Sequence, residues 1–377
     1  MERIRFGMIG GGFGAFIGDV HRRASRITNR FKLAGGAFDA DEIKGKEFGR
    51  TEGIEDSRCY ATIEDFLRGE LSLPEGERIE AVALVTPNYL HFPHAKKLLE
   101  NGFHVMCEKP MTMTVDQAAE LQELVVKTNL SFALAHTYTG YPMVREMREL
   151  IGQGILGTIQ RVDAQYYQGW INSIIHGREN KITGVWRLEP EYSGISSCMG
   201  DIGVHAFNML EYATGLQVIS VLSDLSNVHE SVQMDLDGTV LLRFDKNLKG
   251  VIRASQVAAG EENGFKVAIY GSKASFRWEQ ENPNELLLLS DTEPTKVYKP
   301  GNAYNTEFAA LSHTMPAGHP EGIYESLANI YHGFAKSICG KSPLEGEFPT
   351  VQEGVRGMKF VHGVVESNER GNIWVEI

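Results

Sequence analysis

Three stretches of this 377-residue chain together hold the residue types that are needed to oxidise an alcohol. A glycine-rich stretch near the N-terminus could hold a dinucleotide, Lys109 could stabilise an oxyanion, and Asp201 with His205 could handle a proton. Oxidation removes a hydride from the carbon and a proton from its hydroxyl, so a hydride acceptor and a base are both required. The combination predicts a redox enzyme that acts on hydroxyl groups.

The glycine-rich stretch has the spacing Gly-x-Gly-x-x-Ala and stands between an apolar run and a helical pattern. Glycines let the backbone approach a pyrophosphate, and the N-terminus of the following helix offers unpaired N–H groups to it. Such turns also occur for steric reasons, but the strand before and the helix after favour cofactor binding. The predicted cofactor contacts in this loop are Gly10, Gly12, Phe13, Gly14 and Ala15.

Further cofactor contacts are expected where later strands end. Asp39 follows the second apolar run, where an acid can accept hydrogen bonds from ribose hydroxyls; alternatively, it is a solvated loop residue. No arginine follows closely to neutralise a 2′-phosphate, so NAD is favoured over NADP. Thr86, Pro87 and Asn88 end another strand and predict a turn over the cofactor edge. His91 is either a cofactor neighbour or the first-turn residue of its helix, and it has too few partners to predict a metal site.

Glu108-Lys109-Pro110 ends the apolar run 104–107, which predicts a buried strand. Open α/β proteins bind their ligands at the carboxyl ends of such strands. We therefore expect Glu108 and Lys109 to contact the cofactor, and Lys109 to contact the substrate as well.

Asp201 and His205 are four residues apart at the predicted start of a helix, and hence on one face. The opposite face would carry Val204, Phe207 and Leu210 toward a core. An aspartate there could instead cap its own helix, or the two could form a surface pair. Their occurrence together with Lys109 favours a substrate site.

Three other side chains are candidates for substrate binding. Trp186 and Arg187 could hold sugar hydroxyls or pack at a domain junction, and the sequence favours neither. Tyr138 could face a sugar, although aromatic residues more often belong to a core or an interface.

Composition narrows the function further. A formal charge of −12 argues against a nucleic-acid partner, which needs clustered basic residues, and no apolar run is long enough to span a membrane. The N-terminus passes directly into the first predicted strand, so no signal peptide is expected. The four cysteines are far apart and have no metal-ligand spacing. Buried or isolated thiols of this kind indicate a reducing compartment, so a cytoplasmic location is expected.

The elements that position these residues fall into two parts. Over residues 1–136, short apolar runs alternate with helical patterns, which predicts a doubly wound, mostly parallel sheet. Its strands are expected over 4–9, 32–38, 81–86, 104–109 and 131–136, with helices that include 91–100 and one capped by Thr114 and Gln117. From 137 to 377, the pattern predicts a largely antiparallel sheet. Its strands are expected near 158–168, 218–228, 237–245, 249–258, 265–271 and 284–289, with helices over 143–151 and 323–338 and an irregular loop over 301–320.

These motifs, in this order and approximate spacing, resemble the glucose–fructose oxidoreductase/inositol dehydrogenase/rhizopine-catabolism (Gfo/Idh/MocA) family over essentially the whole chain. The resemblance implies an N-terminal Rossmann domain, a C-terminal open-faced and mainly antiparallel sheet, and nicotinamide chemistry on sugars or cyclitols. It also implies that Lys109 is the catalytic lysine and that Asp201 and His205 are the substrate-site pair. Two departures leave the substrate open: the stretch before Asp201 has fewer glycines than usual, and residues 136–142 lack a common arginine.

The main hypothesis is NAD-dependent oxidation of a ring secondary alcohol on a sugar, glycoside or cyclitol. His205 would accept the proton, Lys109 would stabilise the charge that develops on oxygen, and Asp201 would orient the substrate and His205. One alternative is a redox-neutral, NAD-dependent glycosidase that oxidises its substrate only transiently. Another is a non-catalytic regulator that senses its cofactor.

The strands of the second half also predict assembly. Val240, Leu242 and Phe244 would share one face, while Leu241 would lie on the other, which makes that second face partly apolar. The family resemblance likewise implies a homodimer or homotetramer that buries this face. In the alternative arrangement, loops such as 301–320 fold back over it.

Overall fold

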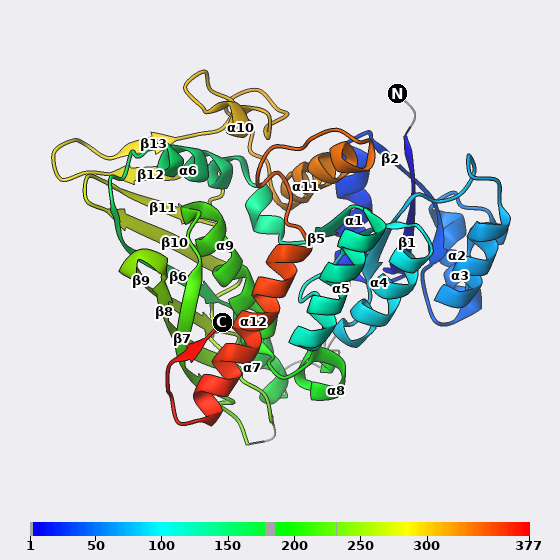
Figure 1. The fold of residues 1–377 in the computed structure, drawn as a ribbon, viewed down its shortest axis with the longest axis horizontal. Helices are drawn as coiled ribbons and strands as arrows, with labels where there is room; N and C mark the ends of the chain where they lie inside the picture. Colours follow the sequence, from blue (N-terminus) through cyan, green and yellow to red (C-terminus); the bar gives the residue numbers. More distant parts are fainter. Residues whose placement is uncertain (1–2, 178–184, 231) are drawn as a thin grey trace. The chain divides into compact units, whose positions relative to one another are not determined.

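The computed structural model of the chain describes residues 3–177, 185–230 and 232–377, which form two compact units (Figure 1). Unit 1 comprises Met1–Gly140 and Ile323–Val355, and unit 2 comprises Tyr141–Gly322 and Arg356–Ile377. No helix among the described residues combines the length and hydropathy needed to cross a bilayer. Each unit is described by itself below.

Unit 1 is a Rossmann-like domain with a five-stranded parallel sheet in the order β2-β1-β3-β4-β5. β2 lies on one side of β1 and β3 on the other, so the direction of winding reverses at β1. Ligands of open α/β sheets bind beside such a switch point, at the carboxyl ends of the strands. The elements are β1 (Ile4–Gly10), α1 (Phe16–Ile27), β2 (Phe31–Ala37), α2 (Glu42–Thr51), α3 (Ile63–Ser72), β3 (Ala81–Val85), α4 (His91–Glu100), β4 (His104–Cys107), α5 (Val115–Thr128), β5 (Phe132–Leu134) and α11 (Ile323–Ile338).

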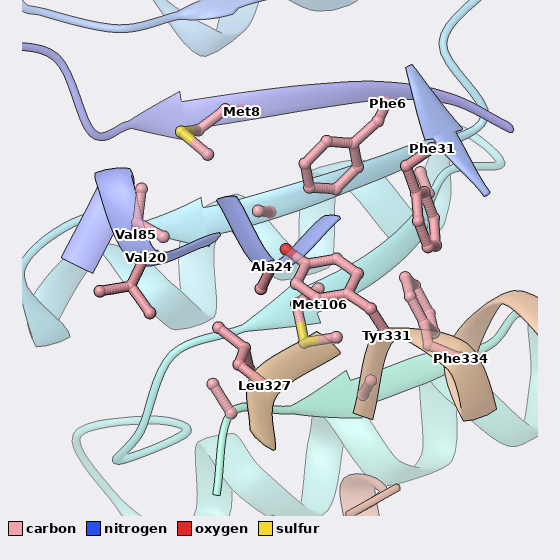
Figure 2. Close-up of a cluster of buried hydrophobic side chains, with 14 of the residues drawn as sticks. Phe6, Met8, Val20, Ala24, Phe31, Val85, Met106, Leu327, Tyr331 and Phe334 are labelled. Carbon is pink, nitrogen blue, oxygen red and sulfur yellow. The ribbon is translucent and has the colours of Figure 1, made fainter. Parts of the chain in front are cut away.

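The core of unit 1 explains why its strands are mostly apolar. All five residues of β3 are buried, as expected for a parallel strand that is covered on both faces. Phe6 of β1, Phe31 of β2 and Tyr331 of α11 form edge-to-face ring contacts, with centroids 5.2–5.6 Å apart (Figure 2). These ring contacts pack α11 against the sheet that the N-terminal strands form.

The position of α11 differs from the sequence prediction, which assigned all of 137–377 to the second domain. Residues 323–355 belong to unit 1, where α11 packs on α1. The physical reason is that the apolar stripe of α11 completes a core whose other members lie mostly between Ile4 and Ala135, and no local sequence pattern records such a distant pairing.

Unit 2 contains a mainly antiparallel, nine-stranded sheet in the order β13-β12-β11-β10-β6-β9-β8-β7-β14. Only the β6–β9 pair is parallel among the pairings of the described strands. The elements are α6 (Pro142–Gly152), β6 (Ile159–Tyr167), α7 (Trp170–Ile175), α8 (Pro190–Ser193), α9 (Val204–Thr214), β7 (Val218–Ser226), β8 (Asp237–Phe244), β9 (Lys249–Ser255), β10 (Gly264–Gly271), β11 (Ser275–Glu279), β12 (Leu286–Leu289), β13 (Lys296–Tyr298), α10 (Glu307–Ala310), α12 (Val351–Glu369, of which 356–369 lie in this unit) and β14 (Val375–Glu376).

Helices cover one face of this sheet. Phe207 of α9 stacks on Phe360 of α12, and α6 and α9 contact strands β6, β10, β11 and β12. The predicted alternation is found in β8, where Val240, Leu242 and Phe244 are buried and Leu241 on the other face is 44% exposed. The sequence analysis did not identify β11, β13 and β14, which have only two to five residues each.

The irregular segment 301–320 is held against α6. Thr306 donates its backbone N–H and its hydroxyl to Glu146 Oε2, at 2.8 and 2.7 Å. Arg145 donates to the Ser312 hydroxyl at 2.8 Å and lies over the ring of Phe308. Because this segment packs on a helix, and Leu241 stays exposed, the fold-back alternative does not hold at that part of the outer face.

Candidate functional site

The predicted glycine loop lies at the switch point of unit 1, directly after β1. Gly10 and Gly11 have φ values of +83° and +80°, which favour glycine over other residues. A Cβ on Gly12 would lie 2.7 Å from the Phe38 carbonyl oxygen, to which the Gly12 N–H donates at 3.0 Å. A Cβ on Gly18 would lie 2.4 Å from the Cα of Gly11. The loop is therefore packed between β2 and α1 so closely that only glycine fits.

This site fits the pyrophosphate and sugar of a dinucleotide on the evidence of its own atoms. A Cβ on Gly14 would meet no atom within 4 Å, so the outer side of the loop is open. Ala15, the N-cap of α1, makes no side-chain cap, which leaves first-turn N–H groups of the helix for an anion. Thr86 Oγ1 is buried and has no hydrogen-bond partner among the described residues. These are the donors and the space that a dinucleotide needs.

Asp39 and Phe13 flank the loop. A Cβ on Gly12 would lie 3.8 Å from the Cβ of Asp39, two residues beyond β2, so Asp39 lies beside the glycine loop. One oxygen, Oδ1, already accepts the Asp41 N–H at 2.9 Å. The Phe13 ring is 53% exposed and meets Phe48 edge to face. Both interpretations of Asp39 thus describe part of its environment: it forms a local turn, and it also borders the site.

The second loop that was predicted to contact the cofactor, Thr86-Pro87-Asn88, is connected to the lysine motif by His91. The buried His91 ring places Nε2 2.9 Å from the Thr86 carbonyl oxygen and Nδ1 2.8 Å from that of Pro110. Burial lowers the pKa of His91, although both carbonyls oppose that shift. His91 is the first residue of α4, as one of the two interpretations predicted, and its buried ring bridges two loops at the carboxyl edge of the sheet.

Glu108 and Lys109 follow β4 at the same edge. Glu108 is 7% exposed, whereas Lys109 is half-buried, and the Lys109 N–H donates to Glu108 Oε2 at 3.1 Å. His136 lies next to them after β5, and burial, reinforced by the charge of Lys109, lowers its pKa to about 3. Tyr138 is 7% exposed in the turn that follows. Parallel strands bring these predicted residues of unit 1 to one edge because all their carboxyl ends point the same way.

Asp201 and His205 lie in unit 2, in a less regular helix than predicted. Met199–Gly203 form a π-helical turn that runs into α9, and His205 is the second residue of α9. Neither segment has a side-chain cap, so the capping interpretation of Asp201 is not supported. The predicted core positions Val204, Phe207 and Leu210 are buried, and so is every other residue of Val204–Leu210, His205 included. π-turns of this kind occur often at functional sites.

The Asp201 carboxylate is held by two side chains of unit 2. Gln256 Nε2 donates to Oδ2 at 2.8 Å, and Arg187 Nε donates to Oδ1 at 3.4 Å. The Arg187 guanidinium lies 4.5 Å from the ring centroid of Trp186. The structure therefore brings Trp186, Arg187 and Asp201 together, with the carboxylate only 18% exposed. The surface-pair interpretation of Asp201 does not hold.

Three supporting residues lay outside the sequence prediction. Asp235 accepts the N–H groups of Ser197 and Met199, at 2.9 and 2.8 Å, and so holds the stretch that leads to Asp201. Burial raises the pKa of Asp235, although these donors oppose the shift. Gln256 has no local signal either. Arg22 donates to the Gly11 carbonyl oxygen at 2.5 Å from the buried side of α1. The only indication of this contact in the sequence was a charged residue, Arg22, on the buried side of the helix.

The described part of the chain contains no cluster of three or more His, Cys, Asp or Glu side chains that could hold a metal ion.

The packing of Gly12 leads to a prediction. Gly12→Ala should weaken NAD binding, or lower the free energy of unfolding, by about 1–3 kcal/mol. The alanine methyl group would overlap the backbone carbonyl of Phe38, which cannot move freely. Titration calorimetry with NAD and thermal melting would measure this. Gly76→Ala is the matched control, since a Cβ there meets open space. Equal behaviour of the two variants would contradict the described loop packing.

Comparison with known proteins agrees with this architecture. The model of the oxidoreductase family with an NAD-binding Rossmann fold matches residues 4–136, and that of the GFO/IDH/MocA C-terminal domain matches residues 144–277. An uncharacterized oxidoreductase of Bacillus subtilis, YfiI, is 31% identical and aligns over 99% of this chain and 96% of its own. A levoglucosan dehydrogenase of Pseudarthrobacter phenanthrenivorans is 26% identical over 100% and 99% of the two chains.

A solved relative extends the match to three dimensions. The crystal structure of an inositol dehydrogenase homolog from Azotobacter vinelandii in complex with NAD+ has a TM-score of 0.93 and 31% identity, and covers 100% of this chain and 98% of its own. The same homolog complexed with NADH and myo-inositol has a TM-score of 0.91 at 30% identity. The resemblance inferred from the sequence is thereby confirmed: this chain belongs to the Gfo/Idh/MocA oxidoreductase family, with an NAD-binding Rossmann domain followed by the family's C-terminal domain.

Proposed function

We propose that this protein is an NAD-dependent dehydrogenase that oxidises a ring secondary alcohol of a cyclitol, sugar or glycoside. The observation that carries this proposal is the placement of Lys109, backed by Glu108, at the carboxyl edge of a dinucleotide-binding sheet. The full-length likeness to an inositol dehydrogenase homolog supports cyclitols as the first substrates to test. The levoglucosan dehydrogenase supports sugars as the second.

The cofactor would be held by residues of unit 1. Gly10, Gly12, Gly14 and the start of α1 would take the pyrophosphate, Asp39 the ribose, and Thr86 Oγ1 a polar group of the nucleotide. When bound, NAD supplies the hydride acceptor. The carboxylate of Asp39 favours NAD because it would repel a 2′-phosphate.

Three side chains would handle the alcohol. His205 would accept the hydroxyl proton, since a neutral imidazole is a competent base. The Lys109 ammonium would stabilise negative charge on the alcohol oxygen as the proton leaves. Asp201, fixed by Gln256 and Arg187, would orient His205 and the substrate. The carbon loses hydride and the oxygen loses its proton, which leaves a ketone.

A substrate panel tests this proposal. The purified protein is incubated with NAD and, in turn, inositols, aldoses, glycosides and uronates, while NADH absorbance and free aglycone are measured. NADH in proportion to a consumed cyclitol or sugar supports the dehydrogenase. Free aglycone without net NADH would assign the redox-neutral glycosidase instead. NAD binding with no turnover across the panel would favour a cofactor-sensing regulator.

We also propose that unit 2 forms a homodimer or homotetramer through the outer face of its sheet. Leu222, Leu241 and Val251 are register partners across β7, β8 and β9 on this face, which makes an apolar row. Light scattering at low micromolar concentration is expected to give a multiple of the 41.9 kDa chain mass. A mass near one chain would contradict this proposal. Leu241→Arg should reduce the assembled mass by placing a charge in the row, whereas Ile43→Arg, at an exposed residue of α2 in unit 1, serves as its control.

A further inference from the structure

A buried chain of three polar side chains stands behind Lys109 in unit 1. His21 Nδ1 lies 2.7 Å from the Tyr331 hydroxyl, and His21 Nε2 lies 2.9 Å from Glu108 Oε1. Exposure is 0% for His21 and Tyr331 and 7% for Glu108. Buried polar groups need hydrogen-bond partners, and each nitrogen of the His21 ring has one in this network. The three residues come from α1, β4 and α11.

The direction of the hydrogen bonds follows from the proton states at the two ends. Burial, and then the charge of Glu108, raises the pKa of Tyr331 well above its usual value, so the hydroxyl keeps its proton. Burial also raises the pKa of Glu108, but the hydrogen bond from His21 and the charge of Lys109 outweigh the effect of burial, so the pKa of Glu108 is lowered overall. An ionised carboxylate can only accept. The network therefore assigns Tyr331 O–H as donor to His21 Nδ1, and His21 Nε2–H as donor to Glu108.

Both oxygens of Glu108 are thereby engaged. Oε1 accepts from His21, and Oε2 accepts from the backbone N–H of Lys109 at 3.1 Å. A carboxylate held at two points keeps one orientation, and its charge stays beside the residue that it supports. The titratable groups facing Glu108 come from five segments: His21, His91, Cys107, Lys109, His136 and Tyr331. Burial lowers the pKa of both His91 and His136, so these two rings add no positive charge at neutral pH.

We propose that His21 and Tyr331 are positioning residues that hold the Glu108 carboxylate against Lys109 and thereby set the reactivity of this lysine. This also gives a reason why α11 belongs to unit 1, because α11 supplies Tyr331, whose hydroxyl lies at the end of the hydrogen-bond network away from Lys109. The role in turnover rests on the proposed function. The state of Lys109, in contrast, can be measured without any substrate.

Competitive labelling with acetic anhydride reads that state directly. Only the neutral amine reacts, so the labelling rate of Lys109, followed by mass spectrometry against pH, reports how firmly its ammonium is stabilised. In His21→Leu, Glu108 loses its fixed place or its charge. The midpoint for Lys109 should then fall by about one pH unit, and labelling below the midpoint should rise about tenfold. A midpoint that stays or rises would overturn the proposal.

Two milder variants protect the test if His21→Leu does not fold. His21→Gln keeps an N–H donor for Glu108 and should restore most of the wild-type midpoint. Tyr331→Phe removes a single oxygen and should lower the midpoint by less than the leucine variant does. The matched control is Tyr60→Phe, which removes another tyrosine hydroxyl that donates to a buried carboxylate, Glu70, at 2.8 Å in the same unit. The proposal would be refuted if the labelling midpoint of Lys109 were the same in Tyr331→Phe as in Tyr60→Phe and unchanged in both His21→Gln and His21→Leu.

A second measurement connects the positioning role of His21 and Tyr331 with turnover. On a substrate that the panel identifies, Tyr331→Phe should lower kcat while KM and NAD affinity hold, and His21→Gln should keep most of the wild-type kcat. His21→Leu should lower kcat by up to about 10²-fold, the size of effect expected when a reacting group is misplaced by about an ångström. A loss confined to KM would overturn the positioning role. Should no panel compound react, the labelling result still decides the positioning role, so its failure and that of the proposed function are distinguishable.

Discussion

Lys109→Met is expected to lower kcat by roughly 10²–10⁴-fold on whichever substrate the panel identifies. Methionine has a similar length but carries no charge, so the developing oxyanion would lose its stabilising cation. NAD affinity should change little by comparison, because the glycine loop and Asp39 are untouched. Stopped-flow measurement of NADH formation, with NAD titration alongside, separates the two effects.

The control for this variant is Lys97→Met on α4 of the same unit. Lys97 pairs with Glu64 on the surface, with 44% of its side chain exposed, and such a pair contributes at most about 1 kcal/mol. Lys97→Met should therefore keep wild-type turnover. Wild-type turnover in Lys109→Met as well would remove Lys109 from the reaction.

His205→Ala is expected to lower kcat/KM by about 10²–10⁴-fold and to change its pH dependence. A base works only when it is deprotonated, so wild-type activity should fall on the acidic side as the imidazole gains a proton. Without His205, that acidic limb should disappear, while Lys109→Ala should keep it. The measurement is kcat/KM from pH 5 to 10 for the wild type and both variants.

The control here is His319→Gln, an exposed histidine of unit 2 whose Nδ1 lies 3.0 Å from the Pro316 carbonyl oxygen. Its pH profile should match the wild type. An acidic limb that persists in His205→Ala but vanishes in Lys109→Ala would exchange the roles of the two residues, and make Lys109 the base.

The sequence by itself determined features whose cause is local. The helix predicted over 91–100 has the bounds of α4, and that over 323–338 has those of α11, because apolar spacing and end signals act within one helix. The strands of unit 1 were recognisable because they are mostly apolar, and all five residues of β3 are buried, as expected for a strand covered on both faces. The glycine loop was recognisable because close packing forbids a Cβ at fixed positions. The predicted capping of α5 is also present, with Thr114 accepting the Gln117 N–H, although the Gln117 side chain reaches back to Met113 rather than to Thr114.

Only the tertiary structure decided which distant residues support the predicted ones. His21 meets Glu108 across 87 residues and Tyr331 across 310, and Gln256 meets Asp201 across 55. The π-turn at Met199–Gly203 depends on Asp235, 36 residues beyond Met199, which accepts a backbone N–H from that turn. These contacts are hydrogen bonds of buried or partly buried polar groups, which need partners inside the fold. Periodicity and composition record the environment of a residue along its own element, but not the identity of the group that another element places beside it.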